Sequence, residues 1–182
     1  MRKHPYKLLA STTVYQNPWI SVREDKIIQP DGQGGIYGVV ESKDSVMIVP
    51  VNDKKEIYLI YTYSYPAQSW NWELPGGGGE GEHAIIASKR ELFEETGISA
   101  QDWTLLGKTR VCNGLMTEQQ ITYLARNLAI AAKKDIPEEK IVSHGVFFPF
   151  TDIHKMINQG KINDGQTLAG LYLAELYLRA EN

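Results

Sequence analysis

The chain has 182 residues, the length of one domain of ordinary size. Hydrophobic residues make up 42% of it and charged residues 23%, which is the composition of a soluble globular protein. A net charge of −3 gives no basic footprint, so we expect no nucleic-acid partner, and no segment is long and apolar enough to cross a membrane. The single cysteine, Cys112, excludes an internal disulfide and fits a reducing cytoplasm, where we expect the protein.

Strand patterns dominate the N-terminal part of the chain. β-rich runs cover residues 13–22, 26–29 and 35–40, with a turn predicted at Pro30-Asp31-Gly32. We therefore expect a β-rich element over residues 1–41 and the main domain over residues 42–182. An element of about forty residues cannot bury enough surface to be stable alone, so it must pack on something else.

Two further β-rich runs, Ser45–Val51 and Ile57–Tyr63, flank the polar sequence 52–55 and predict a hairpin. The extended run Trp70–Leu74 then leads into four consecutive glycines, Gly76–Gly79. Because glycine lacks a side chain, a loop of this kind can turn tightly and bring its backbone close to a ligand.

An acidic helix is predicted from Glu82 onward, closed by Gly97 at the position of a left-handed cap. Glu91, Glu94 and Glu95 are spaced i, i+3 and i+4, so their carboxylates fall on one helix face within roughly 100°. Three like charges so close repel one another unless a cation lies between them. Carboxylate oxygens are hard ligands, which predicts Mg²⁺, or alternatively Mn²⁺.

In the C-terminal half, three strand patterns are followed by two helical patterns. Strands are predicted at residues 103–111, 120–128 and 142–150. A short helix is predicted over residues 152–159 with Asp152 as its N-cap, and a terminal helix over residues 167–180. The apolar side chains expected to face inward from the terminal helix are Leu168, Leu171, Tyr172 and Leu178.

Residues 76–98 carry one spaced pattern of fixed residue types. A random sequence would match this pattern by chance at roughly one start point in a billion. Its members are Gly76, Glu82, Arg90, Glu91, Leu92, Glu94, Glu95, Gly97 and Ile98. The pattern resembles the motif of the Nudix hydrolases without a mismatch. The resemblance implies an α/β fold, the Nudix α/β/α sandwich with a mixed sheet. It also implies metal-assisted attack of water on a diphosphate linked to another group.

The resemblance assigns roles to residues of this motif. Glu91, Glu94 and Glu95 would bind the metal, and a backbone carbonyl at Gly76 or its neighbour Gly77 would complete the site. In the family the arginine at the place of Arg90 orients the catalytic carboxylates, which is compatible with an ordinary i,i+4 ion pair to Glu94.

Over nearly its full length the chain resembles the ADP-ribose and nucleoside-diphosphate-sugar pyrophosphatase branch. The resembling stretches are the N-terminal element, residues 61–66 and 70–75 before the motif, and residues 156–164 followed by Thr167. Ser64 and Asn113 replace an arginine and a proline that many ADP-ribose hydrolases have. The resemblance therefore implies hydrolysis of several nucleotide sugars, such as ADP-ribose or GDP-mannose, into nucleoside monophosphate and sugar phosphate.

In this branch two chains exchange N-terminal strands, and aromatic side chains of that element stack on the base. Trp19 and Tyr37 occupy the matching places and imply a homodimer, although simple packing of strand aromatics explains them equally well. The water-activating base of the branch comes from a loop beyond the motif. Glu139 is the preferred candidate, then Glu138, with His144 a weaker alternative; two solvated loop glutamates are the competing interpretation.

Two other functions compete with this interpretation. One is a dinucleotide or nucleoside triphosphate pyrophosphatase, although the marker sequence of the NADH-cleaving branch is missing after the motif. The other, from a different class, is a catalytically silent nucleotide-sugar-binding sensor. Such sensors usually lose motif glutamates or gain a DNA-binding domain, and this chain does neither.

Overall fold

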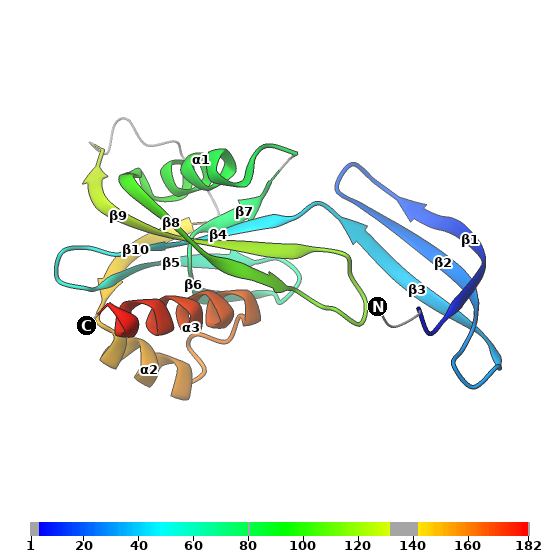
Figure 1. Cartoon of the computed structure of the whole chain (residues 1–182). Helices are drawn as coiled ribbons and strands as arrows, with labels where there is room; N and C mark the ends of the chain where they lie inside the picture. The colour runs from blue at the N-terminus through cyan, green and yellow to red at the C-terminus, as the bar shows by residue number, and fades with distance from the viewer. Residues whose placement is uncertain (1–3, 80, 132–141, 182) are drawn as a thin grey trace. The chain divides into compact units, whose positions relative to one another are not determined.

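A computed structural model describes residues 4–79, 81–131 and 142–181. The chain divides into two compact units, and each is treated by itself. Unit 1 comprises Met1–Lys43 with Arg110–Gln119, and unit 2 comprises Asp44–Thr109 with Gln120–Asn182 (Figure 1). No helix among the described residues is long and apolar enough to cross a membrane.

Unit 1 is built on an antiparallel meander of three strands, β1 (Lys7–Gln16), β2 (Ile20–Ile28) and β3 (Gly34–Ser42). The prediction of one continuous strand over residues 13–22 is wrong, because the chain turns between β1 and β2. The Asn17 side chain causes this turn, since its Oδ1 accepts hydrogen bonds from the backbone N–H groups of Trp19 (2.9 Å) and Ile20 (2.8 Å). The turn predicted at residues 30–32 is present, with Gly32 at φ 87°.

Unit 1 has almost no core of its own. Ile27 is its only buried large apolar side chain among the described residues. The large apolar side chains that are instead exposed just before β1, on the three strands and in the first turn are Tyr6, Leu8, Leu9, Val14, Tyr15, Trp19, Ile36 and Tyr37. So much exposed apolar surface on so small a sheet is typical of an interaction surface.

Unit 2 contains two sheets and three helices. The first sheet has the order β7-β4-β9-β8 and the second the order β10-β5-β6. The strands are β4 (Ser45–Pro50), β5 (Ile57–Ser64), β6 (Ser69–Glu73), β7 (Gly76–Gly78), β8 (Ile98–Arg110), β9 (Gln119–Ile130) and β10 (Val142–Phe148). The helices are α1 (Ala84–Thr96), α2 (Phe150–Asn158) and α3 (Gly165–Ala180). Because β4 pairs parallel to β9 and antiparallel to β7, the sheet is mixed, as predicted.

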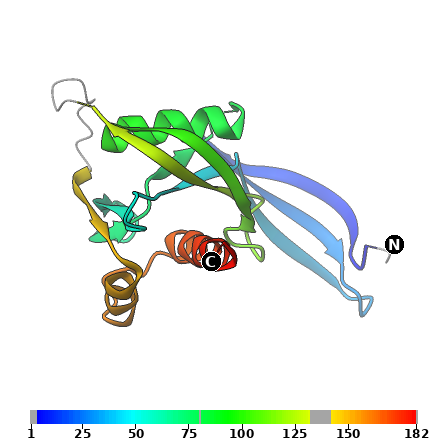
Figure 2. The ribbon, with the colours of Figure 1, turned by 60° about the vertical axis from the view of Figure 1, so that its left-hand side comes forward.

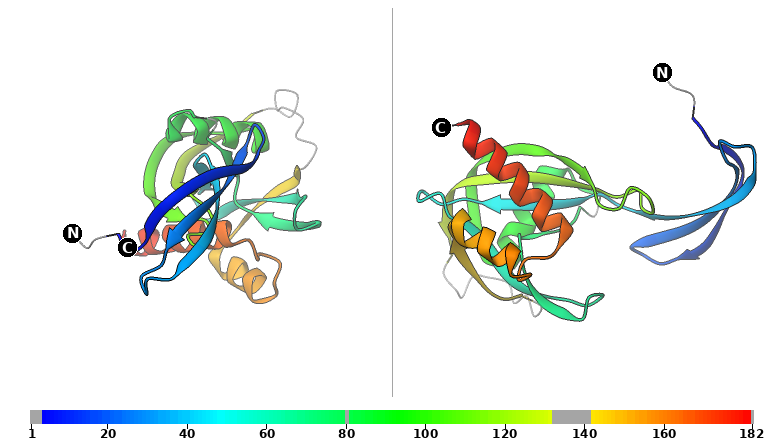
Figure 3. Two further views of the ribbon diagram at one scale, coloured as in Figure 1. Left: turned by 90° about the vertical axis from the view of Figure 1, so that its right-hand side faces the viewer. Right: turned by 90° about the horizontal axis from the view of Figure 1, so that it is seen from below.

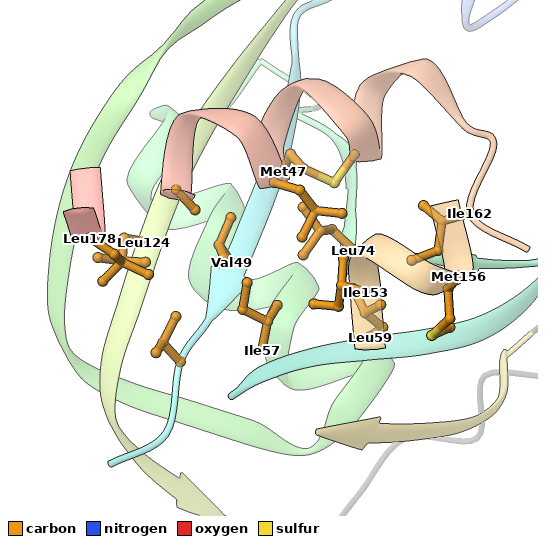
Figure 4. Close-up of a cluster of buried hydrophobic side chains, with 13 residues drawn as sticks. Met47, Val49, Ile57, Leu59, Leu74, Leu124, Ile153, Met156, Ile162 and Leu178 are labelled. Atoms are coloured by element: carbon orange, nitrogen blue, oxygen red, sulfur yellow. The ribbon is translucent and has the colours of Figure 1, made fainter. Parts of the chain in front are cut away.

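The helices cover opposite sides of the sheets, with α1 on one side and α2 with α3 on the other (Figure 1, Figure 2, Figure 3). Successive side chains of β4 pack alternately into two core clusters, one on each face of the sheet. Met47, Val49 and Val51 join the larger core cluster, which also contains residues of α2 and α3 (Figure 4). Val46 and Ile48 join a second cluster with Ala87 and Leu92 of α1. A strand buried on both faces reads as a continuous apolar run, which explains the sequence of β4. This layering confirms the α/β/α prediction.

The predicted hairpin of β4 with β5 is present only as one pair of residues next to the turn, and the prediction of paired strands is wrong. The turn is closed by the bridge between Val51 and Ile57 and by the hydrogen bond from Asn52 N to Glu56 O (3.1 Å). After this bridge the two strands enter different sheets. β9 pairs with β4 along Ser45–Pro50 and β7 pairs with its other edge at Ser45–Met47, whereas β5 pairs with β6 and β10.

The helix boundaries differ from the predictions by two or three residues. Helix α1 begins at Ala84 rather than Glu82, because a turn precedes it in which Glu82 N donates to Gly79 O (2.6 Å). Gly97 adopts the predicted left-handed cap, with φ 67°.

The N-cap predicted for the first of the two later helices is wrong, and the second has a cap for which no prediction was made. Pro149 rather than Asp152 is the N-cap of α2, and Asp164 caps α3 by accepting from Thr167 N (2.6 Å). On α3, Leu171 and Leu178 are buried as predicted, whereas Tyr172 is 62% exposed.

Candidate active site

The glycine segment lies between β4 and the acidic helix. Three of its four glycines form the short strand β7 rather than a loop, with Gly76 opposite Met47 and Gly77 opposite Val46. A Cβ on Gly76 would collide with the carbonyl oxygen of Val46. A Cβ on Gly77 would lie 2.6 Å from the carboxyl carbon of Glu91. Glycine at position 76 therefore allows β7 to approach β4 closely, and glycine at position 77 leaves room for the Glu91 carboxylate.

Helix α1 directs its motif glutamates toward this strand. The Gly76 N–H donates to Glu95 Oε2 at 2.8 Å, and the Glu91 carboxylate lies against Gly77. The Glu94 side chain, which pairs with Arg90, is more exposed than that of Glu91. The backbone of both candidate glycines thus lies beside carboxylates of α1.

Arg90 joins the parts of the motif. Its guanidinium lies 2.8 Å from Glu94, 3.0 Å from Glu91 and 3.1 Å from Glu82, and its Nη2 donates to the carbonyl of Gly78 at 3.3 Å. Burial disfavours the Arg90 cation, but the hydrogen bonds and charges of these three glutamates outweigh it and raise the pKa of Arg90. The side chain is a permanent cation in contact with the carboxylates that the resemblance expects it to orient. Glu82 precedes the helix and reaches the site through Arg90.

The donor set fits a hard divalent cation, because carboxylate oxygens of α1 meet a glycine backbone where β7 touches the helix. Within the part of the chain that the structure describes, no three His, Cys, Asp or Glu side chains are already grouped as a metal site. Arg90 engages Glu91 and Glu94, and Glu95 accepts from the Gly76 backbone. A bound cation would compete with these contacts for the carboxylate oxygens.

A cavity of about 480 Å³ opens beside this site, within unit 2. Gly76, Gly77 and Glu95 form one wall, and the others come from β4, β5, β6 and the start of α3. Glu73 and Asp164 are acidic side chains of this lining. Burial, and secondarily the charge of Asp164, raises the pKa of Glu73 to about 7. Sequence reasoning noted Glu73 and Asp164 only as parts of resembling stretches and missed their place in the cavity.

The other predicted site residues lie elsewhere. Glu138 and Glu139 are outside the described residues. His144 is on β10, where its ring packs against Tyr61 (5.5 Å between ring centroids) and Trp72 (5.1 Å). Tyr61 and Trp72 alternate along β5 and β6 with the cavity residues Ile60, Thr62 and Glu73, so His144 lies on the opposite face of that sheet.

Trp19 and Tyr37 are both in unit 1 and are not brought together. Trp19 is 77% exposed in the turn before β2, and the Tyr37 hydroxyl on β3 donates to the carbonyl of Gly114 (2.9 Å). Since Tyr37 pairs with Asp25 of β2, about six residues, or roughly 20 Å, separate the two aromatic positions along the strand.

The layered fold, the glycine segment and the glutamate helix are the features that the resemblance to the Nudix hydrolases predicted. A family model described as the NUDIX domain matches residues 41–169, and one described as the nucleoside diphosphate sugar hydrolase N-terminal domain matches residues 6–40. The chain therefore belongs to the Nudix family and is a Nudix hydrolase, which confirms the resemblance. Nudix hydrolases generally use divalent metal ions, and the donor set described above fits one.

Similar proteins span nearly the whole chain. It is 27% identical over 175 residues to the ADP-ribose pyrophosphatase of Mycobacterium tuberculosis, covering 94% of this chain and 84% of the relative. It is 22% identical over 178 residues to the ADP-ribose pyrophosphatase of Bacillus subtilis, covering 97% and 96%. The crystal structure of an ADP compounds hydrolase superimposes with a TM-score of 0.83 at 21% identity, covering 100% and 98% of the two chains, and so shares the fold.

Proposed function

We propose that this protein hydrolyses the diphosphate bond of nucleoside diphosphate sugars, releasing nucleoside monophosphate and sugar phosphate. The observation that carries the proposal is the contact of β7 with α1, where Gly76 N binds Glu95 and Gly77 lies against Glu91, at the wall of a cavity of about 480 Å³. The family match over residues 6–40 and the names of the relatives support nucleotide sugars as the substrate class.

In this proposal Glu91, Glu94, Glu95 and the Gly76 carbonyl hold Mg²⁺, with Mn²⁺ as the alternative. When bound, such a cation neutralises charge on the diphosphate and lowers the pKa of the attacking water. Arg90 orients Glu91 and Glu94 through its ion pairs. Glu139, or else Glu138, would accept the proton of the attacking water.

A panel of substrates tests this function. With Mg²⁺ we expect release of nucleoside monophosphate from ADP-ribose, GDP-mannose and UDP-glucose at rates far above those for nucleoside triphosphates and dinucleotides. Removing the metal with a chelator should abolish the release, and adding Mg²⁺ back should restore it. Faster cleavage of triphosphates or dinucleotides would instead identify the protein as that kind of pyrophosphatase. Tight binding of nucleotide sugars without any cleavage would identify a sensor.

We further propose that the protein is a cytoplasmic homodimer. In this proposal the N-terminal element, residues 1–41, forms the dimer contact and completes the base pocket of the partner chain. The exposed apolar side chains of β1–β3 support this, because a three-stranded sheet with one buried large apolar residue needs a partner surface. The separation of Trp19 from Tyr37 also supports it, since one chain cannot place both aromatics on a single base. One aromatic from each subunit could meet across a two-fold axis.

Mixing two inactive variants tests the exchange between subunits. Chains with Trp19→Ala should complement chains with Glu95→Gln, because one site of each heterodimer would combine an intact Trp19 with an intact Glu95. We expect activity well above that of either variant alone, measured after subunit exchange is confirmed by mass. A mixture of wild-type and Glu95→Gln chains calibrates the exchange. A monomer at working concentration, or no rescue after complete exchange, would contradict the arrangement.

A further inference from the structure

The glycine strand has little within itself to hold it in place. Strand β7 has three residues, all glycine, and lies at the edge of its sheet, where β4 is its partner among the described strands. Glycine loses more conformational freedom on ordering than any other residue, so such a segment depends on contacts from outside it. In the proposed function this backbone presents the Gly76 carbonyl to a cation, and a metal ligand has to be held to within about 0.5 Å.

Helix α1 contacts the glycine segment from one side. The Gly76 N–H donates to Glu95 (2.8 Å), and the Gly78 carbonyl accepts from Arg90 (3.3 Å). Both side chains belong to the proposed metal site, and a bound cation would compete with the Gly76 N–H for the oxygens of Glu95. A constant position of Gly76 therefore needs an anchor that takes no part in metal binding.

Helix α3 supplies such an anchor from the other side of the sheet. The hydroxyl oxygen of the fully buried Thr167 accepts from Leu74 N (3.1 Å), two residues before Gly76. The backbone of α3 also lies against the Leu74 side chain, because a Cβ on Gly170 would come within 2.8 Å of Leu74 Cδ1 and 3.4 Å of Met47 Cγ. Leu74 and Met47 both lie against this helix (Figure 4), and Met47 is the residue that pairs with Gly76.

The first turn of α3 is itself held in place. Asp164 is the N-cap of the helix and accepts from Thr167 N at 2.6 Å. The neighbouring Gln166 donates from Nε2 to Ser45 Oγ (3.3 Å), and Ser45 pairs with Gly78 at the far end of β7. Two consecutive residues of α3 thus bind the chain close to both ends of the glycine strand.

We infer from these contacts, on the basis of the proposed function, that Thr167 is a positioning residue for the metal site. Its hydroxyl oxygen holds Leu74 N, and the next residue, Pro75, has a fixed φ and a carbonyl that accepts from Ile48 N (2.8 Å). The position of Leu74 is therefore passed along a stiff backbone to Gly76. Thr167 acts through this backbone and touches neither the cation nor the substrate.

Three substitutions test the hydroxyl oxygen of Thr167. Thr167→Val keeps the shape of the side chain and removes the acceptor, whereas Thr167→Ser keeps the acceptor, and Thr167→Ala differs from Thr167→Ser by this one oxygen atom. We expect the Kd for Mn²⁺, measured by calorimetric titration, to rise about tenfold in Thr167→Val and Thr167→Ala. It should stay within about twofold of the wild-type value in Thr167→Ser. If Thr167→Val does not fold, the comparison of Ala with Ser decides.

Thr122→Val is the matched control. Thr122 is fully buried like Thr167, and its methyl group would lie 3.7 Å from a Cβ on Gly170, so it borders the same part of α3. Its hydroxyl, however, accepts from the side chain of Gln120 (3.0 Å) and not from the backbone before β7. Thr122→Val should lower the Tm and leave the affinity for Mn²⁺ unchanged. An equal loss of Mn²⁺ affinity in Thr122→Val and Thr167→Val would show that packing alone matters and would overturn the inference.

The remaining outcomes separate this inference from the proposed function. Wild-type affinity for Mn²⁺ in Thr167→Val and Thr167→Ala, or a loss that Thr167→Ser shares, would overturn the inference while hydrolysis of nucleotide sugars stands. A loss of kcat in Thr167→Val without any change in Mn²⁺ affinity would overturn it as well. A wild-type protein that binds Mn²⁺ but cleaves no nucleotide sugar would refute the proposed function, and the titrations would still decide the role of Thr167.

Discussion

Glu95→Gln should lower turnover by about two orders of magnitude or more without unfolding the protein. The glutamine oxygen can still accept the hydrogen bond from the Gly76 N–H, which Glu95 accepts at 2.8 Å, so the contact of α1 with β7 is preserved. What the variant loses is a negative charge where carboxylates and a glycine backbone converge. Turnover with saturating Mg²⁺ and thermal unfolding, measured on the same preparation, separate the two effects.

Glu94→Gln should follow the same course, with an added loss of the ion pair to Arg90. Glu175→Gln provides a matched control, because Glu175 also pairs with an arginine on a helix but lies on α3. That variant should keep near-normal turnover. Near-normal turnover in both Glu94→Gln and Glu95→Gln, with metal still bound, would remove these residues from the mechanism.

The sequence predicted the helix of the candidate site well because its determinants are local. The spacing of Glu91, Glu94 and Glu95 fixes one helix face, and Gly97 ends the helix by adopting a conformation that few other residues tolerate. Arg90 likewise contacts the glutamates that its spacing places beside it.

The cavity could not be predicted in this way because its walls come from distant parts of the chain. Glu73 and Asp164 are about ninety residues apart and meet only because β6 and the start of α3 flank the same space. The pairing of β4 with β9 is similarly distant, so local patterns favoured a hairpin of β4 with β5 instead. In unit 1 the error was smaller and local, since the side chain of Asn17 creates a turn inside a continuous β-rich pattern.

The remaining large effect is expected at the proposed general base. Glu139→Gln should reduce kcat by about a hundredfold or more while leaving the affinity for metal nearly unchanged, because a general base acts on water rather than on the cation. Steady-state kinetics give kcat, and calorimetric titration with Mn²⁺ gives the metal affinity. Glu138→Gln is the matched comparison, since it removes the same charge from the adjacent residue, and we expect a smaller effect.

The pattern of results in these variants assigns the role of each residue. A loss of metal affinity alone in Glu139→Gln would make Glu139 a ligand. If neither quantity changes in Glu139→Gln or Glu138→Gln, the base lies elsewhere, and His144→Gln is the next variant to measure. The packing of His144 between Tyr61 and Trp72, on the sheet face opposite the cavity, leads us to expect near-normal turnover from it. A large loss of kcat in His144→Gln with the fold intact would therefore show that β10 presents this ring differently when substrate is bound.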